Sequence, residues 1–381
     1  ELAETAGAET VAKVIQNREA VHPGTYIGKG KIEEVASLLR ALDANGVICD
    51  DELSPAQLNN LERELDCKVM DRTLLILDIF AGRAVSSEGK IQVELAQLRY
   101  RAARLVGLRE SLSRLGGGIG TRGPGEKKLE TDRRLIRTRI SALKAELAQV
   151  EKHRELIRGK RSRGNLKTAA IVGYTNAGKS TLLNTLTGAG ILAEDKLFAT
   201  LDPTTRVLEL KDGQQILLTD TVGFIRKLPH HLVEAFKSTL EEAKYADYII
   251  HVVDASNPQA ELQMFTVYET LRELGATGKK IVTLLNKQDQ VTGSGIRDLK
   301  ADYTVKCSAR TGEGLDEFKD VLAKLLAEEQ IYLEELYPYS EAGKIQKIRE
   351  FGSLLSEEYR EDGIFVKARV PAEIFVSVMP K

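Results

Sequence analysis

One stretch of the sequence has the residue types and spacing that suit phosphate chemistry. Residues 173–180 read GYTNAGKS, a G-x-x-x-x-G-K-S pattern. In such a loop, backbone N–H groups and a helix N-terminus surround phosphate oxygens. Lys179 would neutralise β- and γ-phosphate charge, and the Ser180 hydroxyl would bind Mg²⁺. The predicted phosphate site comprises Gly173, Tyr174, Thr175, Asn176, Ala177, Gly178, Lys179, Ser180 and Thr181.

The flanking residues supply the context that this pattern requires. The apolar residues 168–172 predict a strand before the loop, and a helix is predicted from Lys179 onward. A second strand, at 216–218, leads to Asp220 in the segment DTVGF. We expect the Asp220 carboxylate to hold Mg²⁺ through water and the Gly223 N–H to face the γ-phosphate.

The choice of base is predicted by the segment NKQD. It places Asn286, Lys287 and Asp289 at the end of a predicted strand. Asp289 would accept hydrogen bonds from N1–H and N2–H₂ of guanine, whereas adenine offers neither donor there. The Lys287 stem would pack over the base, and Ser308 and Ala309 in KCSAR would bring a backbone N–H to guanine O6. These ordered motifs predict an enzyme that binds GTP and GDP and hydrolyses GTP with Mg²⁺.

A switch segment is expected between the phosphate loop and Asp220. In LFATLDPTTRV, Thr200 is our preferred third Mg²⁺ ligand, with Thr204 and Thr205 as alternatives, and Phe198 is assigned to the same nucleotide-binding segment. The order of this segment would depend on the γ-phosphate. Phe224 occupies the position where many GTPases carry a water-orienting glutamine, so intrinsic hydrolysis should be slow or use another group.

The elements that position these residues indicate an α/β chain of four parts. Residues 1–86 predict a small parallel α/β unit, with strands near 11–15, 46–51 and 67–73, and with Ser54 capping a helix that starts at Pro55. Apolar heptads over residues 91–115 and 129–157 predict an antiparallel coiled-coil hairpin within 87–164, its second helix about 30 residues long. A P-loop GTPase domain (165–330) and a small α+β domain (331–381), expected as strand, helix, strand, strand, complete the chain.

Charge is concentrated in the hairpin. The whole chain has a net charge of −1, but residues 99–167 hold 20 Lys and Arg against 7 Asp and Glu, a charge of +13. Such an excess predicts a polyanionic partner, with nucleic acid first and a solvated helical face as the alternative.

The hairpin tip contains the sequence GGGIGTRGPG at residues 116–125. Its literal G-x-G-x-x-G is not a dinucleotide fingerprint, because a heptad helix precedes it and Leu143 stands where an acidic residue is needed. Glycine permits close backbone approach, so we expect the tip to enter folded RNA, a partnerless loop being the alternative. The predicted RNA contacts are Gly118, Gly120, Arg122, Gly123, Lys127, Lys128, Arg133 and Arg134.

Composition favours a cytoplasmic protein. There is no run of 18 apolar residues, no visible secretory signal, and only three scattered cysteines, which we expect to be reduced thiols in or near the cores. We expect a monomer.

The combined motifs resemble the HflX family of P-loop GTPases. The resemblance rests on TYIGKGK (25–31), RLGGGIGTRGPGEKKLETDRR (114–134), GYTNAGKSTL (173–182), LFATLDPTTR (197–206), DTVGF (220–224) and NKQD (286–289). It implies binding to the large ribosomal subunit and its RNA, and splitting or rescue of stalled or idle ribosomes under stress. By resemblance, Asn176 would hold a catalytic K⁺, with capping of the loop as the alternative, so the expected catalytic groups are Lys179, Asn176 and Gly223.

Three functions stay open at this point. The chain could split ribosomes, could act as a large-subunit assembly factor, or could be an RNA-remodelling ATPase that the GTPase domain regulates. The resemblance attributes ATPase activity to the N-terminal region. There, YIGKGK is either a phosphate-binding turn or an ordinary βα turn.

Overall fold

The computed structural model describes residues 1–115, 124–163, 166–188, 190, 197–211, 214–227, 232, 237–291 and 295–380. Packing divides the chain into two compact units. The first comprises Glu1–His153, Glu194–Asp202 and Ile225–Leu240, and the second comprises Arg154–Ala193, Pro203–Phe224 and Glu241–Lys381. The chain therefore crosses between the units several times, and each unit is described by itself.

The first unit contains a small α/β layer. Its strands β1 (Gly46–Cys49) and β2 (Lys68–Asp71) pair in parallel, with Gly46 opposite Lys68. The connecting helix α3 (Pro55–Leu65) begins with the expected cap, since Ser54 Oγ accepts from Gln57 N at 3.2 Å and the Gln57 side chain accepts from Ser54 N. The helices α1 (Leu2–Thr5), α2 (Lys29–Ala41) and α4 (Arg72–Arg83) complete the layer.

The strand predicted near residues 11–15 is wrong. These residues adopt no regular structure, and Val11 and Ile15 are 50% and 66% exposed. Their apolar character was misleading because only Val14 among them packs against the core of this layer. The two strands β1 and β2 form the sheet alone in the described part of the unit.

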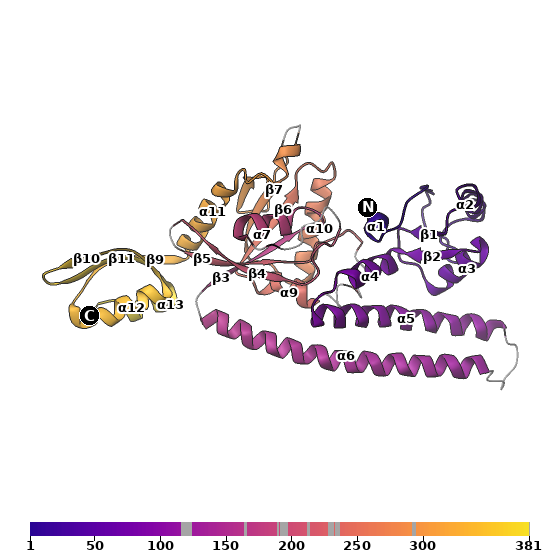
Figure 1. Ribbon diagram of the computed structural model, residues 1–381, viewed down its shortest axis with the longest axis horizontal. Helices are drawn as coiled ribbons and strands as arrows, with labels where there is room; N and C mark the ends of the chain where they lie inside the picture. Colours follow the sequence, from indigo (N-terminus) through magenta and orange to yellow (C-terminus); the bar gives the residue numbers. More distant parts are fainter. Residues whose placement is uncertain are drawn as a thin grey trace. The chain divides into compact units, whose positions relative to one another are not determined.

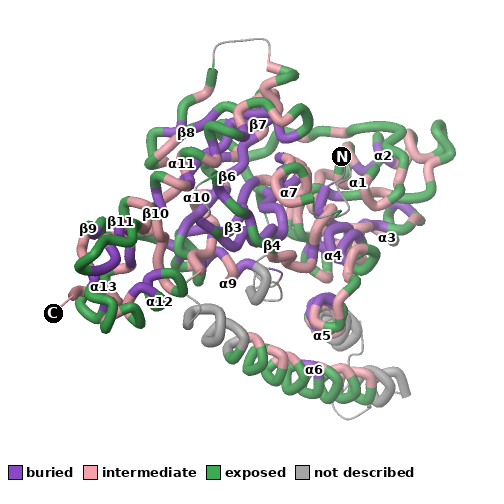
Figure 2. Tube along the Cα trace, turned by 60° about the vertical axis from the view of Figure 1, so that its left-hand side comes forward, coloured by how far each residue is buried: buried purple, intermediate pink, exposed green. Residues whose placement is uncertain are grey.

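Two long helices follow, α5 (Ser87–Leu115) and α6 (Pro124–Arg163). They run antiparallel (Figure 1), and Arg139 on α6 donates to both oxygens of Glu94 on α5 at 2.7 and 2.9 Å. The expected hairpin is thus confirmed, but α6 has 40 residues rather than about 30, a length of about 60 Å. Of the predicted seam of α6, Leu143 is fully buried and Ile136, Ile140, Leu147 and Val150 are half-buried, whereas much of the remaining surface is exposed (Figure 2).

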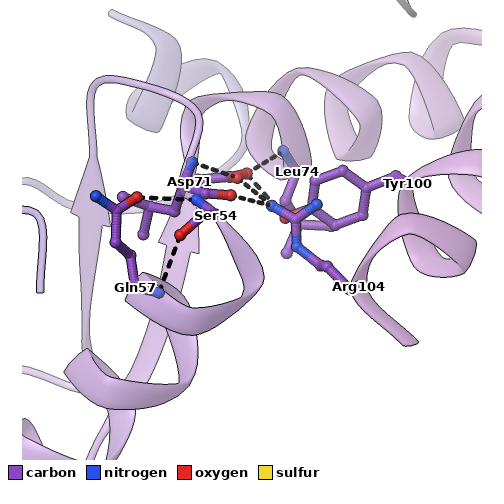
Figure 3. A network of polar contacts seen from close by, with 7 residues as sticks. Ser54, Gln57, Asp71, Leu74, Tyr100 and Arg104 are labelled. Atoms are coloured by element: carbon purple, nitrogen blue, oxygen red, sulfur yellow. Dashed lines mark hydrogen bonds and ion pairs between the residues drawn. The ribbon is translucent and has the colours of Figure 1, made fainter. Parts of the chain in front are cut away.

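The first helix of the hairpin is fixed to the α/β layer by one carboxylate. Asp71, which has no solvent exposure, accepts from Leu74 N at 2.8 Å and so caps α4. It also accepts from Leu53 N, from the Tyr100 hydroxyl at 2.9 Å and from Arg104 (Figure 3). The Arg104 guanidinium also lies 3.3 Å from the Tyr100 ring centroid. Because a buried carboxylate is stabilised by such donors, Asp71 ties α5 to the layer.

The second unit is built on a six-stranded sheet in the order β4-β5-β3-β6-β7-β8. Its strands are β3 (Lys167–Gly173), β4 (Thr204–Glu209), β5 (Gln215–Asp220), β6 (Tyr248–Asp254), β7 (Lys280–Asn286) and β8 (Tyr303–Lys306). All pair in parallel except β4, which runs antiparallel to β5 at the edge. The helices α7 (Lys179–Thr187), α10 (Ala260–Glu273) and α11 (Leu315–Glu328) belong to this unit, and α9 (Lys237–Tyr245) begins in the first unit and continues into the second at Glu241. The central strands are nearly all buried (Figure 2), as expected for a parallel sheet with covered faces.

A smaller sheet follows α11. Its strands are β9 (Gln330–Tyr337), β10 (Ser353–Arg360) and β11 (Gly363–Pro371), antiparallel in the order β10-β11-β9. The helices α12 (Ala342–Phe351) and α13 (Ala372–Val378) pack on one face of it (Figure 1), against the alternate β11 residues Ile364, Val366, Ala368 and Val370. The predicted order of strand, helix, strand, strand is confirmed, and α13 was missed.

No helix in the described part of the chain is long and apolar enough to cross a membrane. All three cysteines are free thiols, with Cys49 and Cys307 buried and Cys67 half-buried.

Candidate nucleotide site

The phosphate loop connects β3 to α7, as its sequence predicts. Two of its residues have left-handed backbones, Asn176 at φ 63° and Gly178 at φ 96°. A Cβ on Gly178 would lie 2.3 Å from Asn286 Nδ2, so only glycine fits there. A Cβ on Gly173 would similarly lie 2.3 Å from the carbonyl oxygen of Val252. The loop thus delivers its backbone N–H groups to the N-terminus of α7, where a phosphate is stabilised by the helix dipole.

Lys179 lies across this loop. Its side chain is buried, and Nζ donates to the carbonyl oxygens of Tyr174 at 3.0 Å and Gly173 at 3.3 Å. Burial lowers the pKa of Lys179 to about 8, an effect that the Asp220 carboxylate opposes. A polyphosphate placed on this ammonium would restore the preference for the charged form, because an opposite charge raises the pKa of a lysine.

The segment after Asp220 is fastened to the loop by its backbone. Thr175 N donates to Phe224 O at 2.7 Å, and Phe224 N donates to Gly173 O at 3.1 Å. A Cβ on Gly223 would lie 3.0 Å from Lys179 Nζ and 2.6 Å from Thr175 Cα. Gly223 therefore lies directly beside the phosphate loop, where its N–H can serve a γ-phosphate. The Phe224 side chain is buried and apolar, so it cannot orient water.

The residues predicted to bind Mg²⁺ lie partly together. Ser180 Oγ donates to Asp220 Oδ2 at 2.7 Å, and a hydroxyl beside a carboxylate is an oxygen donor set that suits Mg²⁺. Of the two alternative switch threonines, Thr204 on β4 stands opposite Asp220, whereas Thr205 shares a hydrogen bond with Thr219. Thr200 and Phe198 belong to the first unit, where Phe198 is buried against the ring of Phe80 at 4.7 Å between centroids.

The base-recognition residues form one network. Asn286, at the end of β7, donates through Nδ2 to Ala177 O and accepts from Ala309 N through Oδ1, both at 2.8 Å. It therefore ties the phosphate loop to the Ser308–Ala309 segment. Ser308 Oγ donates to Asp289 Oδ1 at 2.7 Å, which orients the carboxylate expected to bind guanine.

One member of this network was missed in the sequence. Lys287 Nζ lies 2.7 Å from Asp254 Oδ2, and Lys287 has a left-handed backbone at φ 63°. Asp254 ends β6, directly opposite Asn286 in the parallel register. The carboxyl ends of adjacent parallel strands meet at one edge of a sheet. The sequence signal that could have identified Asp254 is therefore its position as the acidic residue at the end of the segment YIIHVVD.

The structure describes the predicted RNA contacts only in part. Gly118, Gly120, Arg122 and Gly123 lie outside the described residues, and Lys127 and Lys128 lie in α6 with side chains outside that description. Arg133 is half-buried and Arg134 is exposed. In the N-terminal turn YIGKGK, the Gly28 N–H that precedes α2 donates to Gln16 Oε1 at 3.0 Å, an internal partner that accounts for this N–H without a phosphate.

The fold and the site define a P-loop GTPase. A parallel sheet, a phosphate loop at a helix N-terminus, an acidic strand end and an Asn-Lys-x-Asp segment lie in the arrangement that this class requires. The chain belongs to the HflX family of GTPases. It is 69% identical to GTPase HflX of Lacrimispora saccharolytica over 379 residues, which cover 99% of this chain and 90% of the relative. It is 43% identical to GTPase HflX of Escherichia coli over 375 residues, 97% of this chain and 88% of that protein.

Three family profiles cover most of the sequence. Residues 1–81 match "GTP-binding GTPase N-terminal", residues 83–161 match "GTP-binding GTPase Middle Region", and residues 168–287 match "50S ribosome-binding GTPase". Among solved structures, a GTP-binding protein from Sulfolobus solfataricus in complex with GDP is 28% identical, with a TM-score of 0.45 over 85% of this chain and 93% of that one. The curated relatives and the family profiles show that the protein is a GTP-hydrolysing enzyme of the HflX family.

Proposed function

We propose that this GTPase binds the large ribosomal subunit and splits or rescues stalled or idle ribosomes. The observation that carries the proposal is the joining of a GTPase site to a strongly basic helical hairpin. Residues 99–167 have a charge of +13, and α6 extends about 60 Å with a largely exposed surface. A long cationic arm suits ribosomal RNA, because phosphate contacts dominate the affinity for nucleic acids. The description "50S ribosome-binding GTPase", matched by residues 168–287, supports the same partner.

In this proposal the bound nucleotide determines when the protein is released from the ribosome. The phosphate loop and Lys179 hold the β- and γ-phosphates, while Ser180 and Asp220 hold Mg²⁺, with Thr200 as the third protein group in the GTP state. Mg²⁺ neutralises the charge that develops on the phosphates. Asp289 and the Ser308–Ala309 segment select guanine. GTP orders the switch segments, and hydrolysis releases them and the ribosome.

The water-attack step needs a polar group that Phe224 does not provide. Asn176 lies in the phosphate loop between Thr175 and Ala177, and its backbone is left-handed. We propose that its side chain holds a K⁺ ion, which would supply positive charge to the transition state. Replacing K⁺ by Na⁺ should then slow GTP turnover, and Asn176→Ala should remove the difference between the two ions.

The first test is steady-state GTP and ATP hydrolysis with and without purified large subunits. We expect the subunits to stimulate GTP turnover strongly, and Lys179→Ala to abolish it. An unstimulated GTPase with normal GTP binding would contradict a ribosomal trigger. ATP turnover that survives Lys179→Ala would favour the RNA-remodelling ATPase. Its loss would exclude a separate N-terminal ATPase.

The second test concerns the hairpin tip. Neutralising Arg122, Lys127 and Lys128 should weaken subunit binding and lower its salt slope by about 2 to 3, since each phosphate contact contributes about 0.7 to 0.9. Intrinsic GTP hydrolysis should stay unchanged. A control variant neutralises Lys13, Lys68 and Lys347, which are exposed and lie outside the hairpin. Equal binding by both variants would refute the role of the tip.

The splitting function and the assembly function can be distinguished by the ribosomal particle on which the protein acts. A splitting factor dissociates mature ribosomes in a density gradient when GTP is present. An assembly factor binds immature large subunits and leaves mature ribosomes intact.

A further inference from the structure

Part of the predicted switch segment, and the residues that follow Gly223 and Phe224, pack inside the first unit. The phosphate loop, Asp220 and Gly223 belong to the second unit, but Glu194–Asp202 and Ile225–Leu240 are part of the first. Thr200 is therefore held by the body that contains the α/β layer and most of the hairpin. The contacts that hold these segments centre on two carboxylates, Asp202 and Asp51.

Asp202 holds the cap of the first helix of the hairpin. Its carboxylate accepts from Ser86 N at 2.8 Å, from Val85 N at 3.1 Å and from the Ser86 hydroxyl, immediately before α5 begins. Ser86 Oγ in turn accepts from Gly89 N at 2.9 Å. A carboxylate at this position satisfies N–H groups that a helix start leaves open and complements the helix dipole. Ser86 thus caps α5 through its hydroxyl, and Asp202, 116 positions away in the sequence, holds this capping residue in place.

Gly89 supplies independent evidence that this contact is built into the chain. Glycine weakens a helix, yet Gly89 lies in the first turn of α5. A Cβ at this position would lie 2.5 Å from Asp202 Oδ1. Glycine therefore makes room for the carboxylate.

Asp51 holds the second segment. It accepts from the Tyr26 hydroxyl at 2.7 Å and from Lys227 Nζ. Burial alone would raise the pKa of Asp51, but the hydrogen bonds from Lys227 and Tyr26 hold it below its usual range. Tyr26 and Lys227 both have left-handed backbones, at φ 65° and 56°, a conformation that persists in such residues only where the surroundings impose it. The neighbouring Arg72 donates to Arg226 O at 2.9 Å.

Each carboxylate contact lies a short length of chain from a γ-phosphate sensor. Asp202 is two residues from Thr200 and two from Thr204, which pairs with Asp220 across the sheet. Two extended residues span at most about 7 Å. Lys227 is four residues from Gly223, at most about 14 Å of chain. Such short connections cannot absorb a large rearrangement of the sensors.

We propose that Asp202 and Asp51 transmit the nucleotide state to the first unit, and that Asp202 delivers it directly to the first turn of the hairpin. This inference rests on the proposed function, in which Thr200 and Gly223 respond to the γ-phosphate. Exchange of GTP for GDP changes the occupancy of the Asp202 cap, and with it the order of the α5 N-terminus. By thermodynamic reciprocity, a partner that immobilises the hairpin changes the affinity for GTP relative to GDP.

The test is hydrogen exchange on the full chain, with Mg²⁺ and either GDP or GTPγS. The informative amides are those of Val85, Ser86 and Gly89, the donors of the cap network. Their exchange should differ between the two nucleotides by at least about fivefold, the lower end of usual coupling between sites. Asp202→Asn should abolish that difference, and Asp51→Asn should abolish the corresponding difference in the peptide containing Lys227.

Ser54→Ala is the matched control, because it removes a helix cap in the same unit at α3, far in sequence from the sensors. It should speed exchange in α3 and leave the nucleotide dependence of α5 intact. Equal exchange of the α5 amides with both nucleotides bound would overturn the inference alone, as would a difference that survives Asp202→Asn. Failure to bind either nucleotide, measured by fluorescent analogue titration, would overturn the proposed function and this inference with it.

Discussion

Asn286→Ala should disconnect the two loops of the nucleotide site that Asn286 joins. The Asn286 side chain is buried and makes two hydrogen bonds of 2.8 Å, to Ala177 O in the phosphate loop and from Ala309 N in the base loop. Truncation leaves that carbonyl and that N–H in a buried environment without their partner. Each stranded group costs about 1–3 kcal/mol, so the folded GTPase domain should lose about 2–6 kcal/mol.

The assay is urea unfolding of the transition that GDP stabilises, compared between wild type and variant. The midpoint should fall at an unchanged slope, because the surface exposed on unfolding is the same. GDP affinity should fall at least about tenfold, equivalent to about 1.4 kcal/mol, since both loops that would hold the nucleotide lose their shared support.

Asn257→Ala provides the matched control. Asn257 accepts from Gln259 N at 2.8 Å, but this bond is exposed, so its loss should cost about 1 kcal/mol or less. Our account of Asn286 as the central link would be refuted if both variants unfolded at the same urea concentration and bound GDP equally well.

Three further outcomes follow from the geometry of the site. Because burial lowers the pKa of Lys179 to about 8, GTP binding should take up more protons at pH 8.5 than at pH 7, which calorimetry in buffers of different ionisation enthalpy would show and Lys179→Ala would remove. Gly178→Ala should lower nucleotide affinity by more than tenfold, since its Cβ would lie 2.3 Å from Asn286 Nδ2, and unchanged binding in a fluorescent titration would contradict that clash. Asp289→Asn should transfer preference from GTP to xanthosine triphosphate, whose C2 oxygen accepts where guanine donates, and retained GTP preference in competition binding would remove Asp289 from base selection.

Local patterns sufficed for much of the nucleotide site. The phosphate loop, the end of β5 and the end of β7 are short contiguous segments, and their glycines, lysine and carboxylates lie where a parallel sheet places them. The N-terminal layer was harder, because the mostly apolar residues 11–15 pack against the described core through Val14 alone. The length of α6 was underestimated because its polar ends lack the heptad pattern yet remain helical.

The contacts that hold the switch segments could not be predicted from such patterns. Asp202 meets Ser86 across 116 residues, and Lys227 meets Asp51 across 176. Neither pair has a spacing rule, because their meeting depends on how the whole first unit packs. Gly89 was a weak sequence signal of the Asp202 contact, because a glycine in the first turn of a long helix can indicate that another group approaches the backbone there.

The residue after Gly223 shows why this GTPase should depend on other parts of its chain or on a partner. Phe224 is fixed by backbone hydrogen bonds to Gly173 and Thr175, and its ring is buried, so no modest side-chain movement can bring a polar group to the attacking water. The chain then enters the first unit at Ile225, where Lys227 is held by Asp51. Any polar group that completes catalysis must therefore come from the phosphate loop, from the switch segments held in the first unit, or from a bound partner. If it comes from either of the last two, hydrolysis and docking of the basic hairpin are coupled through the same residues, and the enzyme reaches its full rate only with the hairpin in place.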